Sequence, residues 1–126
     1  MTLRSCAALR STLLRAALGA TLLAAAPARA ETLETPSFTI AIERHCAEGN
    51  VSCDKVGYTG TSKKNGKAIR LNGKTTHTLC ADGVTPCRFL GYEFRNGNVN
   101  YTVTEAGELT VTIGRKLVLQ ERGEWK

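Results

Sequence analysis

Apolar and polar residues alternate along much of this chain. In the segment 38–43 apolar side chains fall at every second position, and the segments 98–104 and 108–113 repeat the pattern. A period of two places successive side chains on opposite faces of a half-buried β-strand. After residue 30, no stretch carries helical spacing over three turns. The pattern therefore predicts an all-β fold.

Turn signals divide the rest of the chain into further short strands. These strands are expected at residues 51–59, 67–71, 74–79, 88–95 and 116–121. Asn-Gly steps, the strongest signal for a two-residue hairpin turn, stand at residues 65–66, 72–73 and 96–97. About eight short strands joined by close turns predict a small antiparallel β-barrel or sandwich.

One sequence unit occurs twice. Residues 46–58 and 80–92 both have the sequence Cys-Ala-acid-Gly, three variable positions, Cys, three more, and then Gly-Tyr. The duplication indicates one supersecondary unit used twice. Gly57 and Gly91 fall inside strand patterns at matched places, so both predict a β-bulge or a close approach of neighbouring backbone. The tyrosines that follow them are expected to pack in the core.

The cysteines of the repeat predict a disulfide framework. They are Cys46, Cys53, Cys80 and Cys87. An even number of cysteines in a short exported chain is typical of disulfide bonding. Three pairings are possible, and the duplication favours one local bridge in each copy. Six residues separate the members of each pair, whereas zinc ligands usually lie two to four apart, and no Cys-x-x-Cys redox motif is present. We expect no metal and no cofactor.

The first 30 residues have the pattern of a secretory signal peptide. Spaced arginines precede an apolar run, and the segment ends in Ala28-Arg29-Ala30, with small residues at both positions that precede signal cleavage. A mitochondrial presequence is the alternative, but it needs neither the apolar run nor the Ala-x-Ala ending. Cys6 precedes the apolar run, so it does not predict a lipid anchor. Cleavage after Ala30 would leave residues 31–126 as one periplasmic or secreted domain without a transmembrane span.

Removing the leader changes the charge. The whole chain carries a net charge of +6, whereas residues 31–126 hold 13 basic and 11 acidic residues, a net charge of +2. This small excess does not favour a nucleic-acid partner. Basic residues nevertheless dominate the segment 55–74, which is either a solvated edge or an anion-facing surface. The candidate binding surface is Lys63, Lys64, Lys67, Arg70, Lys74, Asp82 and Arg88.

Catalytic signatures are missing from the sequence. His45 precedes a cysteine, His77 lies within a predicted strand, and neither stands in a nucleophile or metal motif. No pair of carboxylates stands out for acid–base work, and no Gly-x-Ser-x-Gly elbow is present. The sequence does not predict an enzyme.

The second half of the chain resembles small exported β proteins of Gram-negative bacteria. Residues 92–97 have the pattern Tyr-x-Phe-x-x-Gly, a strand followed by a turn. This motif is distantly similar to one in the periplasmic inhibitors of c-type lysozyme, a resemblance that implies a small antiparallel barrel, a periplasmic location and inhibition of a protein partner. That family places a Ser-Gly-x-x-Tyr loop where this chain has the loop 80–87.

Taken together, these features predict a non-catalytic binding protein. The leading hypothesis is an inhibitor or immunity-type protein that blocks a protein partner through a disulfide-closed loop or the basic segment. Loops fixed at both ends lose little entropy on docking. The alternatives are a module that binds an anionic envelope polymer or lipid head group, and a structural protein of the envelope.

Overall fold

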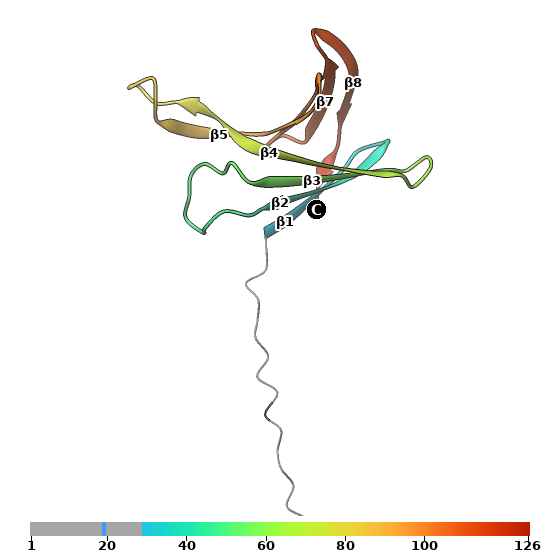
Figure 1. Cartoon of the computed structure of the whole chain (residues 1–126), viewed down its shortest axis with the longest axis horizontal. Helices are drawn as coiled ribbons and strands as arrows, with labels where there is room; N and C mark the ends of the chain where they lie inside the picture. Colours follow the sequence, from blue (N-terminus) through green and yellow to red (C-terminus); the bar gives the residue numbers. More distant parts are fainter. Residues whose placement is uncertain (1–18, 20–28) are drawn as a thin grey trace, which may run out of the picture.

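Nine antiparallel strands form a single sheet that curls into a nearly closed barrel (Figure 1). This is a computed structural model, which describes residue 19 and residues 29–126. The strands are β1 (Arg29–Glu34), β2 (Phe38–Arg44), β3 (Val56–Ser62), β4 (Ala68–Leu79), β5 (Pro86–Asn96), β6 (Val99–Thr104), β7 (Glu108–Ile113), β8 (Lys116–Arg122) and β9 (Glu124–Trp125). The predicted all-β fold is confirmed. The predicted signal peptide lies outside the described residues, apart from residues 19, 29 and 30.

The sheet is an up-and-down meander. Each strand from β1 to β7 pairs with the next strand along the chain. β9 follows β8 after the single residue Gly123 and pairs with β1, with Trp125 opposite Leu33 and Glu124 opposite Glu34. The last strand segment therefore joins the two edges of the sheet.

Side-chain alternation places the core on the concave face. Ile40 and Ile42 of β2 are buried, and Tyr58 of β3 packs against Phe94 of β5 with ring centroids 5.0 Å apart. Tyr58 and Tyr92 are 3% and 1% exposed, so the tyrosines of the repeat are core residues as predicted. The buried apolar residues are Leu33, Ile40, Ile42, Cys53, Val56, Tyr58, Leu71, Tyr92, Phe94, Val103, Leu109 and Val111.

The hairpin predicted at Asn72-Gly73 is wrong. β4 runs without interruption through both residues, and Gly73 lies opposite Val56 on one side and Phe94 on the other. A two-residue hairpin turn needs positive φ angles, which neither residue has. The glycine is needed for another reason, because a Cβ at this position would overlap the Glu93 carbonyl oxygen. The other two Asn-Gly steps are turns, with φ values of 72° at Gly66 and 62° at Gly97.

The start of β3 differs from expectation, and β1 was not predicted. The strand predicted at 51–59 begins at Val56, because residues 51–55 belong to the disulfide-closed loop that precedes it. β1 was not predicted, since Leu33 is its only buried apolar residue and the pattern of the segment is weak. Cleavage after Ala30 would leave Glu31–Glu34 of this strand paired with β2.

The repeat corresponds to two hairpins, β2–β3 and β4–β5, but its two glycines differ. Gly91 has a φ of 152° and lies beside a register shift: Thr76 is opposite Gly91 and His77 is opposite Phe89, which leaves Leu90 as the extra residue of a β-bulge. Gly57 pairs in regular register, and a Cβ added there would lie 3.4 Å from His45 Nε2, an ordinary contact. The bulge prediction is confirmed at Gly91 and wrong at Gly57.

Candidate functional site

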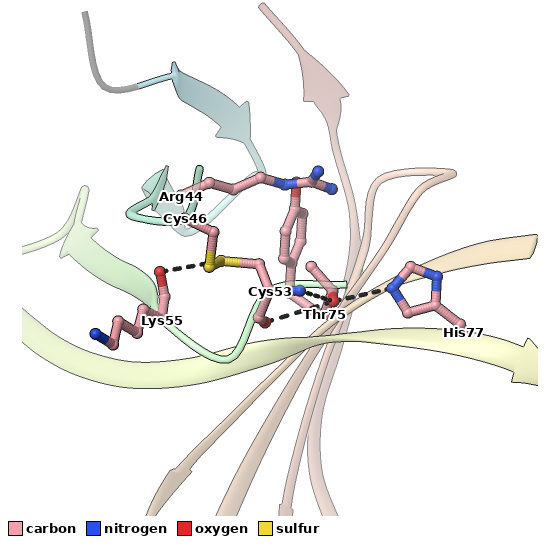
Figure 2. Close-up of a disulfide and its surroundings, with 7 residues drawn as sticks. Arg44, Cys46, Cys53, Lys55, Thr75 and His77 are labelled. Atoms are coloured by element: carbon pink, nitrogen blue, oxygen red, sulfur yellow. Dashed lines mark hydrogen bonds between the residues drawn. A yellow bond between two sulfur atoms is a disulfide. The ribbon is translucent and has the colours of Figure 1, made fainter. Parts of the chain in front are cut away.

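The first disulfide loop, residues 45–55, is fastened to the core. Cys46 and Cys53 are bonded, with Cα atoms 5.8 Å apart, and Cys53 is 3% exposed. The Cys53 N–H donates to Thr75 Oγ1 at 2.9 Å, and the Thr75 N–H donates to the Cys53 carbonyl at 2.9 Å (Figure 2). His77 lies on the other side of this hydroxyl, with Nε2 2.9 Å from Thr75 Oγ1. The loop is thus held to β4 as well as closed on itself.

The second disulfide loop, residues 80–87, extends from the tip of the β4–β5 hairpin. Cys80 and Cys87 are bonded, with Cα atoms 5.1 Å apart, so both bridges are local, as the duplication favoured. Inside the loop, Asp82 accepts hydrogen bonds from the backbone N–H groups of Val84 and Thr85, at 3.0 and 2.9 Å, and from the Thr85 hydroxyl. These bonds lower the pKa of Asp82 from 3.8 to about 2, with the Thr85 hydroxyl as the largest cause. The carboxylate therefore fixes the shape of an exposed loop.

The order of the second loop is expected to depend on ionised Asp82. Because the pKa of Asp82 is lower in the folded loop than in an unfolded chain, the stabilisation is fully present above pH 3.8 and is lost as the pH falls through about 2. Replacing Asp82 with alanine should accelerate amide hydrogen exchange at Val84 and Thr85 at neutral pH and leave the amides of the barrel strands unchanged. Exchange measured by NMR tests this, and equal protection in the variant would contradict it.

The two loops lie at the same end of the sheet (Figure 1). Residues of both loops line one cleft of about 670 Å³. The first loop contributes most of the lining and the second contributes Thr85 and Pro86. Large apolar side chains are exposed on and beside these loops. Val51, which lines the cleft, is 62% exposed, Val84 in the second loop is 79% exposed, and Leu79 at the end of β4 is 60% exposed. The cleft and these exposed apolar side chains form the candidate functional site, which we call the loop cleft.

The predicted basic surface does not come together in one place. Lys63, Lys64 and Lys67 lie in the β3–β4 turn, whereas Asp82 and Arg88 lie at the opposite end of the β4–β5 hairpin. The 12 residues of β4 separate the two groups, roughly 36 Å of extended chain. Between them, Arg70 pairs opposite Thr59, and Lys74 pairs opposite the acidic Glu93.

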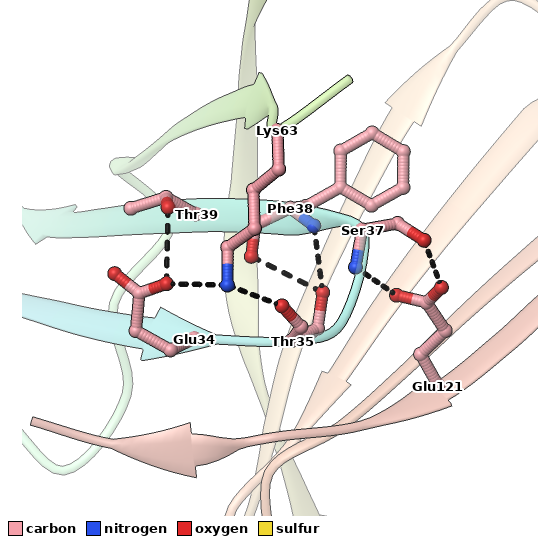
Figure 3. A network of polar contacts seen from close by, with 7 residues as sticks. All are labelled: Glu34, Thr35, Ser37, Phe38, Thr39, Lys63 and Glu121. Carbon is pink, nitrogen blue, oxygen red and sulfur yellow. Dashed lines mark hydrogen bonds and ion pairs between the residues drawn. The ribbon is translucent and has the colours of Figure 1, made fainter.

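Lys63 makes contacts within the protein. Its ammonium group lies 2.9 Å from Glu34 Oε2 and donates to the Thr35 carbonyl at 2.6 Å (Figure 3). The hydrogen bonds from Lys63 and Thr39 lower the pKa of the Glu34 carboxyl. Ser37 in the same turn hydrogen-bonds Glu121 of β8. Lys63 therefore helps to hold the β1–β2 turn, while Lys64 and Lys67 remain exposed at the β3–β4 turn.

The two histidines contact different kinds of groups. His45 Nε2 lies 3.5 Å from a carboxylate oxygen of Glu43, and both side chains are 51% exposed. His77 hydrogen-bonds Thr75 and meets the ring of Phe89 edge-on at 5.7 Å. Within residues 29–126, no group of three or more His, Cys, Asp or Glu side chains is placed to hold a metal ion.

Sequence reasoning missed a second group of residues, at the mouth of the barrel. Arg44 follows Ile40 and Ile42 in the inward register of β2, and its guanidinium lies over the rings of Phe89 and Tyr92. The signal was present, because an arginine occupies a position where the alternation calls for an apolar residue. Only the structure shows that β5 brings two aromatic rings to it.

The fold and these sites define a small antiparallel β-barrel with two disulfide-closed loops at one end. No protein-family model, curated protein or solved structure is similar enough to this chain to count as a match. Nowhere in the described residues is there a helix long and apolar enough to cross a membrane.

Proposed function

We propose that this protein is a non-catalytic binding protein that blocks a protein partner through the loop cleft. The observation that carries the proposal is the convergence of the two disulfide-closed loops on one cleft. Hydrogen bonds fix each loop further. Thr75 of β4 holds the first loop, and Asp82 holds the second loop from within. Binding elements that are ordered before contact lose little conformational entropy when they dock.

The exposed apolar side chains of the loop cleft support a protein as the partner. Val51, Leu79 and Val84 are exposed on elements that project from the barrel, and protein–protein interfaces place such side chains at their dry centre. Scattered exposed apolar residues need no explanation, but here Val51 lines the cleft, Val84 lies in its second loop and Leu79 directly precedes that loop. An interface of ordinary size covers about 800 Å² on each partner, and we expect it to include both loops.

A periplasmic location is part of the same proposal. We take residues 1–30 as a signal peptide that exports the chain to the periplasm, since local disulfide bonds persist in oxidising compartments. The resemblance to periplasmic lysozyme inhibitors supports the fold and the compartment of this proposal. Its motif residues Tyr92 and Phe94 are buried and Gly97 forms a turn, so the motif bears on the fold rather than on the contact surface.

A second candidate function uses the other end of the molecule. Lys64 and Lys67 are exposed at the β3–β4 turn, and an anionic envelope polymer or lipid head group would be attracted to them. Binding of that kind would weaken steeply with salt, because exposed charges are screened within about 10 Å at 0.1 M ionic strength. The two ends of β4 thus correspond to two testable functions.

Affinity capture with paired variants distinguishes the two. The protein is exported from the full chain, so that its bridges form, and is immobilised beside a loop-cleft variant (Val51→Ser, Leu79→Ser, Val84→Ser) and a turn variant (Lys64→Glu, Lys67→Glu). We expect one stoichiometric envelope or secreted protein that is retained by the turn variant and lost by the loop-cleft variant, and that binds again one-to-one after purification. Capture of a polymer or lipid that only the turn variant loses would replace this function with the alternative. Capture of nothing would overturn both.

A further inference from the structure

The mouth of the barrel contains a pocket that is separate from the loop cleft. It has a volume of about 460 Å³, and β1, β2, β5 and β9 all contribute to its lining. The lining residues used below are Glu31, Arg44, Phe89, Tyr92, Trp125 and Lys126. We call this the mouth pocket.

Arg44 is held rigidly at the wall of the mouth pocket. Its guanidinium carbon lies 4.9 Å from the ring centroid of Phe89 and 5.3 Å from that of Tyr92, within the range of a cation–π contact. Its Nε donates to the Tyr92 hydroxyl at 3.1 Å. Figure 2 shows the extended Arg44 side chain near the Cys46–Cys53 bridge. Two rings and one hydrogen bond therefore fix the plane and the direction of the guanidinium.

The Tyr92 hydroxyl connects Arg44 to Glu31. It accepts the hydrogen bond from Arg44 and donates its own proton to Glu31 Oε2 at 3.1 Å. Burial raises the pKa of Tyr92, so the phenol remains a donor across the ordinary pH range. Glu31 is thus engaged with the tyrosine, not with the guanidinium, and no ion pair between Glu31 and Arg44 forms in the described chain.

The terminal amino groups of Arg44 remain open. Within residues 29–126, neither Nη1 nor Nη2 makes a hydrogen bond or an ion pair, although the side chain is half-buried. A guanidinium carries five N–H donors in a planar fork, and only one of them is used here. A fixed fork with two parallel donors matches a planar carboxylate, which it binds with two hydrogen bonds.

The remaining walls of the mouth pocket indicate which chemical group could lie beside a carboxylate bound to Arg44. Phe89 supplies an apolar ring, and Trp125 is held in place because its Nε1 donates to the Glu105 carbonyl at 2.9 Å. Two cations, Arg44 and Lys126, share the pocket with the carboxylates of Glu31 and Glu105, so its field is balanced and does not attract anions in general. The specific feature is the fork of donors beside aromatic rings.

We propose that the mouth pocket binds a carboxylate attached to an aromatic or aliphatic body, with Arg44 holding the carboxylate. The carboxylate could come from a free small acid or from the C-terminus of a peptide, and the two sources share this chemistry. The inference does not depend on the proposed function, since the pocket is lined by other residues than the loop cleft.

Trp125 gives a direct readout, because it is the only tryptophan in the chain. The protein exported from the full chain is titrated with phenylacetate, with a short peptide that ends in phenylalanine, and with phenylacetamide, the neutral analogue of the first. We expect a saturable change in tryptophan fluorescence with phenylacetate at a Kd of about 1 mM or below, and at least a tenfold weaker response to phenylacetamide. Stronger binding of the peptide than of the free acid would identify a chain terminus as the natural source.

Variants test the role of Arg44. Arg44→Gln should weaken phenylacetate binding by about tenfold or more, and Arg44→Lys should recover only part of the loss because an ammonium lacks the fork. Arg115→Gln, an exposed arginine in the β7–β8 turn, is the matched control and should leave binding unchanged. Equal affinity for the acid and the amide in the unmodified protein, or no binding of any acid by about 20 mM, would overturn the inference even if the Arg44 variants fail to fold.

Discussion

Replacing Gly91 with alanine is expected to destabilise the barrel by about 3 kcal/mol or more, enough to unfold much of a domain of this size. Gly91 has a φ of 152°, and a Cβ there would overlap the Val103 carbonyl oxygen on the neighbouring strand β6. The clash is with backbone, which cannot rotate away as a side chain can. Strand β5 would have to separate from β6 or lose its bulge.

Gly57 is the matched control, because it occupies the same place in the other copy of the repeat. Its backbone is regular, and the nearest atom to an added Cβ is a ring nitrogen of the exposed His45, at 3.4 Å. Gly57→Ala should therefore change the free energy of unfolding by less than about 1 kcal/mol, since the gain in chain stiffness offsets small contacts. Denaturant unfolding of both variants measures the difference. Similar losses at the two positions would show that the close approach at Gly91 is wrong.

Removing the first disulfide should cost more stability than removing the second. Both bridges have a sequence separation of 7, so the loop-closure model assigns each about 2.5 kcal/mol. The surroundings differ, because Cys53 is buried at 3% exposure whereas Cys87 is exposed. Replacing Cys46 and Cys53 by alanine removes buried sulfur as well, so we expect a total loss of about 4 kcal/mol.

The comparison uses Cys80→Ala with Cys87→Ala as the second double variant, for which about 2.5 kcal/mol is expected. The two bridges close loops of equal length, so their contribution through the unfolded state is the same. The difference between the two losses of stability therefore measures the packing of the first bridge against the core. Thermal and denaturant unfolding give both values. If the second bridge proved the more stabilising, the buried position of Cys53 would not be the deciding factor.

Local patterns predicted the strands that carry strong alternation. The segment 108–113 matches β7 residue for residue, and the duplicated cysteines correctly favoured two local bridges. In these cases the information lies within about ten neighbouring residues. The hairpin prediction at Asn72-Gly73 was wrong because the role of the glycine depends on Glu93 and Phe94, which pack beside it from a different strand.

The candidate sites were harder to predict for the same reason. The residues of the predicted basic surface are close in sequence, but β4 separates the lysines of the β3–β4 turn from Asp82 and Arg88, and Lys63 pairs with Glu34. Conversely, Arg44, Tyr92 and Trp125 are far apart in sequence and meet only because the sheet closes. Neither result can be obtained without the strand register.

The pairing of each cysteine with the next one along the chain has a consequence for biogenesis. If the chain is exported as proposed, an oxidant that acts as soon as two thiols have emerged from the translocation channel would, among the four cysteines of the described residues, join Cys46 to Cys53 and then Cys80 to Cys87. Vectorial oxidation of this kind gives the native bonds in order. Thiol–disulfide exchange, which takes seconds to hours when bonds must be reshuffled, would not be needed. Maturation of this barrel should therefore proceed in cells that contain an oxidase but lack a disulfide isomerase.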